Sequence, residues 1–272
     1  MTSTRPLILV SNDDGITSHG IRTLVHLMKQ LGDVVVVAPN SPQSGMGHAI
    51  TIAYPLRLYK TDIFNDIPAY ECSGTPADCV KLAKSHVLKD RAPDLVVSGI
   101  NHGSNTSISV LYSGTMSAAI EAAIEGIPAI GFSLCDFTRD ADFSHTHEHV
   151  LRIASAVLEK GLPKKVALNV NFPAKQTNPI QEIRICRQAN AKWQEEFDQR
   201  RDPYGRSYFW LAGNFVNFDE GTDTDEAALS ENCTSVVPCH FDLTHYDAID
   251  LMRNWNINVP APALSNHHTP ES

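Results

Sequence analysis

The stretch LILVSNDDG, Leu7–Gly15, sets a short apolar run directly before polar and acidic residues. Leu7–Val10 is continuously apolar, which is typical of a strand buried on both faces of a parallel sheet. In an open parallel sheet, ligands bind beyond the carboxyl ends of the strands. The stretch therefore predicts the first strand and, directly after it, part of a functional site.

Short apolar runs alternate with helical stretches through the first half of the chain. This alternation predicts an α/β fold, a mostly parallel Rossmann-like sheet with helices on both faces. The further predicted strands are Val34–Val37, Leu95–Val97, Ala129–Phe132 and Val166–Asn171, and the predicted helices are Ile21–Leu31, Asp78–Leu88, Ser117–Ile124 and His147–Gly161.

The pattern changes after Pro173. The DPYGR turn and the Tyr208–Leu211 segment indicate antiparallel hairpins rather than further βα units. We expect an α/β core over residues 1–173, an extension over 174–260 and a flexible tail over 261–272. The acidic segment Asp219–Glu226 reads as a solvated turn.

Composition excludes several classes of protein. The 272 residues are 42% hydrophobic, which is ample for a core, and carry 22 Lys+Arg against 31 Asp+Glu, a net charge of −9. This charge argues against a nucleic-acid polymer or an anionic membrane surface as partner. No apolar run approaches the roughly 18 residues of a membrane span. Six scattered cysteines without a C-x-x-C motif favour a reducing compartment, so we expect a cytoplasmic protein.

Two carboxylates, Asp13 and Asp14, follow the first strand. They repel each other unless a cation or a proton offsets their charge. Oxygen ligands suit a hard divalent ion, Mg²⁺ or Mn²⁺. The competing interpretation is a helix cap formed by Asp14 or Thr17. For a lone aspartate we would favour the cap, and for a pair after a strand we favour metal.

Polar residues also follow the third predicted strand, in Ser98–Asn105. Asn101 can give a metal a neutral oxygen ligand, although an Asx turn alone explains it equally well. His102 is a candidate for proton transfer, but an exposed loop histidine is the commoner case.

Tyr112–Thr115 stands immediately before the Ala-rich predicted helix. Backbone N–H groups at a helix start bind phosphate, and the hydroxyls of Ser113 and Thr115 can add hydrogen bonds. Ordinary capping by either hydroxyl uses the same donors and is compatible with phosphate binding. The loop Ser41–His48 after the second strand is likewise rich in glycine and hydroxyl groups.

Several motifs are absent from the sequence. It has no GxGxxG after the first strand, no GxxxxGK[ST], no GxSxG and no HExxH. Dinucleotide oxidoreductases, P-loop NTPases, serine hydrolases of the α/β type and zinc metalloproteases are therefore disfavoured.

The joint order of several motifs resembles the SurE family of metal-dependent 5′/3′-nucleotidases, also called stationary-phase survival proteins. Any one motif is weak, but their joint order is specific and covers nearly the whole chain. The motifs are NDDGI (Asn12–Ile16), SGMGHAIT (Ser44–Thr51), GTPADCV (Gly74–Val80), PDLVVSGINHGSN (Pro93–Asn105), YSGT (Tyr112–Thr115), NVNFP (Asn169–Pro173), DPYGR–YFWL (Asp202–Leu211) and SVVP…FDLTHYDAI (Ser235–Ile249).

The resemblance implies a ligand set and an assembly. One divalent metal ion per subunit would be held by Asp13, Asp14, Ser44 and Asn101. Many relatives carry Arg-Ser where this chain has Gln43-Ser44, which leaves the serine in place. Phosphate would be held by residues of two loops: Asn105, Ser113, Gly114 and Thr115. A C-terminal hairpin and arm would exchange between subunits of a homodimer or homotetramer.

These expectations combine into a hypothesis for the reaction. Metal-activated water would hydrolyse a nucleoside 5′- or 3′-monophosphate to nucleoside and phosphate, with Asp13 positioning or deprotonating that water. A covalent aspartyl-phosphate is the competing mechanism, but adjacent Asp13 and Asp14 lack the spacer of the D-x-D phosphatases. The alternative functions are exopolyphosphatase activity on short chains and a non-catalytic nucleotide-binding regulator.

Overall fold

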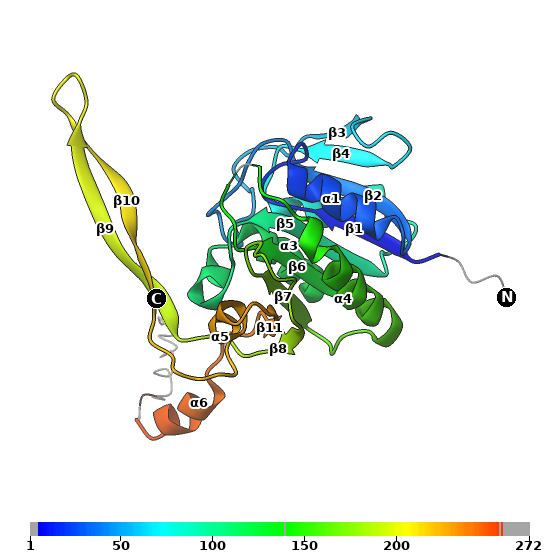
Figure 1. Cartoon of the computed structure of the whole chain (residues 1–272). Helices are drawn as coiled ribbons and strands as arrows, with labels where there is room; N and C mark the ends of the chain where they lie inside the picture. The colour runs from blue at the N-terminus through cyan, green and yellow to red at the C-terminus, as the bar shows by residue number, and fades with distance from the viewer. Residues whose placement is uncertain (1–4, 139, 256, 258–272) are drawn as a thin grey trace, which may run out of the picture. The chain divides into compact units, whose positions relative to one another are not determined.

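The computed structural model describes residues 5–138, 140–255 and 257 (Figure 1). Of the described residues, 5–138 and 140–241 belong to one compact unit, and 242–255 and 257 belong to a second. The strands are β1 (Leu7–Ser11), β2 (Asp33–Pro39), β3 (Leu58–Thr61), β4 (Ala69–Cys72), β5 (Leu95–His102), β6 (Ala129–Leu134), β7 (Val166–Phe172), β8 (Ile183–Ile185), β9 (Ala191–Arg201), β10 (Ser207–Asn217) and β11 (Thr234–His240).

Nine strands form one sheet, in the order β3-β4-β2-β1-β5-β6-β7-β11-β8. The pairs β3–β4 and β7–β11 are antiparallel, and the other neighbours run parallel. Helices pack on both faces of this sheet, as Figure 1 shows. The helices of the first unit are α1 (His19–Met28), α2 (Pro76–Leu82), α3 (Gly114–Ile124), α4 (His147–Lys160) and α5 (Asp225–Ser230), and α6 (Tyr246–Arg253) belongs to the second unit.

The side chains of β1 alternate between two hydrophobic cores. Ile8 and Val10 belong to the core that contains α1 and α4, and Leu7 and Leu9 belong to the core that contains α2 and α3. Both sets are buried, which explains why the strand reads as one continuous apolar run rather than as an alternation. The predicted α/β fold with helices on both faces is confirmed.

The strand order reverses at β1. The chain passes from β1 to β2 on one side and later returns to β5 on the other, so β1 and β5 flank a topological switch point. Ser11, the last residue of β1, is the register partner of Ser98, and β5 continues beyond Ser98 to His102. The loops that follow therefore leave the same edge of the sheet.

The predicted strands are all present, and the helices differ mainly at their ends. The first helix begins at His19 and ends at Met28, rather than spanning Ile21–Leu31. The helix predicted over Asp78–Leu88 is an α-helix up to Leu82 that continues as one π-helical turn to Val87. Thr75 and Asp78 cap it reciprocally, which explains why it begins at Pro76.

Beyond Pro173 the chain adds two strands to the sheet and forms a separate hairpin. Strands β8 and β11 belong to the nine-stranded sheet, so the sheet does not stop at residue 173. Strands β9 and β10 form a separate antiparallel hairpin around Asp202–Arg206, as the DPYGR turn predicts.

The prediction of a solvated turn at Asp219–Glu226 is wrong for part of the segment. Asp225 is fully buried at the start of α5, and Thr224 caps that helix. Asp219 accepts hydrogen bonds from Arg187. Composition reports the average charge of such a segment but not the environment of each carboxylate.

The second unit contains α6, which begins after the capping residue His245. The predicted flexible tail over 261–272 lies outside the described residues. Among residues 5–138, 140–255 and 257, no helix is long and apolar enough to cross a membrane.

Candidate active site

Asp13 follows β1 and is 4% exposed. Its Oδ1 accepts a hydrogen bond of 2.5 Å from the hydroxyl of Thr115. Burial raises the pKa of Asp13 to about 6, the hydrogen bond from Thr115 opposes this change, and the charge of Asp14 adds to it. A cation beside Asp13 would relieve the cost of burying its charge.

The first turn of α3 packs directly against Asp13. A Cβ atom added at Gly114 would lie 2.6 Å from Cβ of Asp13, so only glycine allows this approach. Ser113 caps the helix by accepting a hydrogen bond from the Met116 amide at 3.0 Å. The capping interpretation is therefore correct for Ser113. The hydroxyl of Thr115 instead donates a hydrogen bond to Asp13.

Asp14 points to a different partner. Its Oδ2 lies 3.1 Å from Nδ1 of His102 and accepts the His102 amide at 3.3 Å. This hydrogen bond raises the pKa of His102 against the opposing effect of its burial. The His102 side chain is only 16% exposed, and its buried Nε2 has no hydrogen-bond partner in the described part of the chain. His102 is thus not an exposed loop histidine, which is the commoner case for such a residue.

Asn101 is 8% exposed at the end of β5. Its amide nitrogen donates to the carbonyl of Gly103 at 2.8 Å, as in a local turn. This bond fixes the orientation of the side chain and leaves the carboxamide oxygen for another partner.

Asn105 is held by a ring of buried asparagines. Its backbone amide donates to Oδ1 of Asn171 at 2.8 Å, Asn171 donates to Asn169 at 3.0 Å, and Asn169 donates to the carbonyl of Asn105 at 2.8 Å. The side-chain amide of Asn105 donates to Ser133. These bonds fix the loop after β5 against β6 and β7.

The loop Ser41–His48 is tied to the same region. The amide of Gln43 donates to the carbonyl of Asp13 at 2.7 Å, and the amide of Gly47 donates to the carbonyl of Tyr112 at 3.1 Å. His48 lies 2.8 Å from the buried carboxylate of Glu121 on α3. Ser44, within this loop, is exposed.

A cavity of about 200 Å³ collects most of the candidate residues. Five of the eight line it: Asp13, Ser44, Asn101, Asn105 and Ser113. The other three candidate residues do not line this cavity. Two of them, Gly114 and Thr115, lie against Asp13. Asp14 is the third and is paired with His102.

The donor set fits a hard divalent cation. The cavity offers the carboxylate of Asp13, the hydroxyl of Ser44 and the amide oxygen of Asn101. Asp14 does not line the cavity, but its negative charge acts on the buried Asp13. No group of three or more His, Cys, Asp or Glu residues suited to a metal occurs within residues 5–138, 140–255 and 257. Ligation would therefore depend on the neutral oxygens of Ser44 and Asn101.

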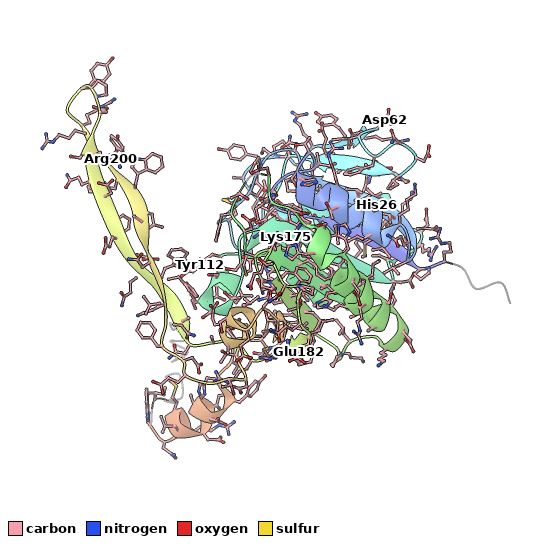
Figure 2. All side chains as sticks on the ribbon, viewed as in Figure 1. His26, Asp62, Tyr112, Lys175, Glu182 and Arg200 are labelled. Atoms are coloured by element: carbon pink, nitrogen blue, oxygen red, sulfur yellow. The ribbon has the colours of Figure 1, made fainter. Side chains whose placement is uncertain are left out.

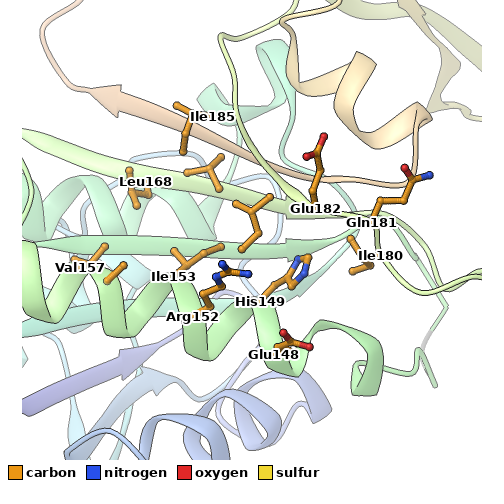
Figure 3. A pocket seen from close by; sticks show the side chains of 13 residues that line it. Glu148, His149, Arg152, Ile153, Val157, Leu168, Ile180, Gln181, Glu182 and Ile185 are labelled. Carbon is orange, nitrogen blue, oxygen red and sulfur yellow. The ribbon is translucent and has the colours of Figure 1, made fainter.

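A larger cavity of about 690 Å³ lies elsewhere, beside α4, β7, β8 and β11 (Figure 3). Its apolar wall includes Ile153, Leu168 and Val236, and His149 and Arg152 also line it. No residue predicted for the site lines this cavity.

Sequence reasoning missed three supporting residues. Asn169 and Asn171 occupy alternate positions of β7, a polar pattern in a buried strand that could have drawn attention to them. The buried Asp225 accepts amides from Ser107 and Ala189 at 2.9 Å, which fixes the 3₁₀ helix Ser107–Leu111 to the base of the hairpin. Nothing in the local sequence around Asp225 predicts this.

The fold and the site define an α/β protein with an oxygen-rich site at the switch point of its sheet. The chain belongs to the family described as Survival protein SurE, whose model matches residues 8–195. It is 67% identical over 252 residues to the 5′-nucleotidase SurE of Cytophaga hutchinsonii, which covers 92% of this chain and 97% of the relative. It is 59% identical over 260 residues to the 5′-nucleotidase SurE of Christiangramia forsetii, covering 95% of this chain and 100% of the relative.

A solved structure is also similar. The crystal structure of the SurE protein from Aquifex aeolicus matches with a TM-score of 0.79 at 38% identity, covering 92% of this chain and 99% of that chain.

Proposed function

We propose that this chain is a 5′-nucleotidase that hydrolyses nucleoside monophosphates to nucleoside and phosphate with the help of a divalent cation. Its family membership and the names of its relatives support the nucleotidase activity. The observation that carries the assignment of the site is the cavity that joins Asp13, Ser44 and Asn101 to the start of α3.

Four oxygen donors are proposed to hold the cation: Asp13, Asp14, Ser44 and Asn101. A bound Mg²⁺ or Mn²⁺, one per subunit, would neutralise phosphate charge and make a water molecule a better nucleophile. Asp13 would orient that water, because Thr115 and the close approach of Gly114 fix its carboxylate. Ser113, the first turn of α3 and Asn105 would bind the remaining phosphate oxygens.

The hairpin supports a proposal about assembly. Large apolar side chains are exposed along β9 and β10, including Phe197, Phe209 and Trp210, which are 58–67% exposed. Such a surface is typical of a protein interface. We place this extension, residues 174–260, in a homodimer or homotetramer formed by arm exchange, and light scattering would give the number of subunits. The six free cysteines support a reducing, cytoplasmic location.

The test is phosphate release from a panel of substrates. Nucleoside 5′- and 3′-monophosphates, pyrophosphate and tripolyphosphate would be compared with EDTA, Mg²⁺ or Mn²⁺, for the wild type, Asp13→Asn and the exposed control Asp66→Asn. Cation-dependent release from nucleotides that is lost only in Asp13→Asn supports the proposal. Release from polyphosphates alone would favour an exopolyphosphatase, and nucleotide binding without release would favour a regulator.

A further inference from the structure

A second cavity adjoins the candidate active site. It has a volume of about 450 Å³ and shares three lining residues, Gly45, Tyr112 and Trp193, with the 200 Å³ cavity that contains Asp13. The two cavities therefore adjoin at these residues. A group attached to a phosphate in the smaller cavity would have the larger cavity beside it.

Hydrogen bonds join the two segments that carry the aromatic residues Tyr112 and Trp193. Tyr112 follows the 3₁₀ helix Ser107–Leu111, and Figure 2 shows it on the side of the core nearest the hairpin. The hydroxyl of Ser107 donates to the carbonyl of Ala191 at 2.6 Å and accepts the amide of Ala191 at 3.0 Å. Ala191 begins β9 two positions before Trp193, so these bonds hold the segment that precedes Tyr112 against the start of the strand that carries Trp193.

Trp193 is also supported from the other strand of the hairpin. Phe215 is its register partner on β10, and the two rings meet edge to face with centroids 5.7 Å apart. Trp193 remains 44% exposed and Tyr112 55% exposed, so both present ring surface to a ligand.

The side chains that line this 450 Å³ cavity favour an uncharged aromatic group over a second phosphate. Leu211 and Gly213 add apolar surface, and among the described residues Glu195 is the only charged one that lines the cavity. A second phosphate would meet a carboxylate and no cation there. An uncharged aromatic ring would stack on the aromatic side chains, and its amino or ring N–H groups could donate to Glu195.

We propose that this cavity is the subsite for the nucleobase, with Trp193 and Tyr112 as the stacking residues. The inference rests on the proposed nucleotidase function and adds to it.

The test compares substrates with and without a base on the full-length protein. We would measure kcat/KM for 5′-AMP, 5′-GMP and ribose 5-phosphate in the wild type, Trp193→Ala, Trp193→Phe and Trp210→Ala. Trp210 is an exposed tryptophan of the same hairpin that lines neither cavity, so its variant is the matched control. Light scattering of each variant would show whether assembly has changed.

We expect Trp193→Ala to lower the preference for the nucleotides over ribose 5-phosphate by on the order of tenfold, mainly through KM. Trp193→Phe should retain most of this preference, because it keeps an aromatic face, and Trp210→Ala should not change it. An unchanged preference in Trp193→Ala, or an equal loss in Trp210→Ala, would overturn the inference.

A second measurement separates this inference from the proposed function. Binding of adenosine and guanosine, which have no phosphate, is measured by calorimetry. If the wild type hydrolyses no nucleotide, the proposed function fails, but nucleoside binding that is weakened in Trp193→Ala still supports the subsite. If the wild type hydrolyses nucleotides and neither nucleoside binding nor base preference depends on Trp193, only the subsite fails.

Discussion

Thr115 donates its hydroxyl hydrogen to Oδ1 of Asp13 at 2.5 Å, although 102 positions separate the two residues. Both side chains are buried, so water cannot replace this bond. The contact joins the end of β1 to the start of α3. It also stabilises the charged form of the carboxylate that we place at the centre of the site.

Replacing Thr115 by Val should raise the pKa of Asp13 further, because the hydrogen bond that lowers it is lost. We expect kcat/KM for nucleotides at neutral pH to fall on the order of tenfold, the usual effect of losing one hydrogen bond to a charged group. Thr115→Ser keeps the hydroxyl and should retain most of the activity. Full activity in Thr115→Val would contradict this assignment.

Asp13→Asn should make the chelator-treated protein more stable at pH 7.5 while abolishing phosphate release. Burial raises the pKa of Asp13 to about 6 from an ordinary 3.8, so the folded state holds the proton longer than the unfolded chain. Stability is therefore lost as the pH rises from about 4 to about 6 and stays lower above that range. The gain in the free energy of unfolding should be about 3 kcal/mol.

Denaturant titrations at pH 3.5 and pH 7.5 would check this, with Asp66→Asn as control. The gain should be small at pH 3.5, where Asp13 of the wild type is protonated in the folded state and mostly protonated in the unfolded state. An equal gain at both pH values would indicate a cause other than the buried charge.

Glu121→Gln should destabilise the protein at neutral pH and less so in acid. Burial raises the pKa of Glu121, but the hydrogen bonds from His48 and Lys81 outweigh burial and leave the pKa lowered. A lowered pKa contributes stability above the ordinary value and loses it as the pH falls through the folded value. Because Lys81 is 43% exposed, we expect a loss of only about 1 kcal/mol at pH 7.

The control is Glu125→Gln directly after the same helix, where the carboxylate is more exposed, at 29%. It should change the free energy of unfolding less than Glu121→Gln does. A loss in Glu121→Gln that stays constant from pH 7 to pH 3.5 would argue against the role of the charge.

Asp225→Ala should cost about 2–4 kcal/mol of stability, because it leaves three backbone amides without their acceptor. Those amides belong to Ser107, Ala189 and Glu226. Urea denaturation would measure the loss. Asp223→Ala is the matched control, since Asp223 is exposed and pairs with Arg187, and it should cost less than about 0.5 kcal/mol. Equal losses in the two variants would refute the role given to Asp225.

The sequence predicts the strands that position the site better than it predicts the contacts that hold the side chains of the site in place. The apolar run Leu7–Val10 and the strand Leu95–Val97 locate Asp13 and Asn101, because parallel strands end at a common edge. The contact of Thr115 with Asp13 and the pairing of Asp14 with His102 depend on how separate elements pack. Local patterns carry no information about such contacts.

Asp225 is a second residue whose contacts the local sequence does not predict. Within DEGTDTDE its sequence context is that of a solvated acidic loop, yet it is fully buried. Its burial is offset by amide groups up to 118 positions away, which only the assembled fold provides.

The bond between Asp225 and Ser107 also has a consequence for the order in which the chain is synthesised. A ribosome releases the strands that carry Asp13 and Asn101 long before it reaches residue 225. Until then the segment that positions Tyr112 and the hairpin lacks its anchor. We therefore expect nascent chains that stop short of α5 to lack nucleotide turnover, and release of phosphate from stalled ribosome complexes would show whether catalysis waits for the completed chain.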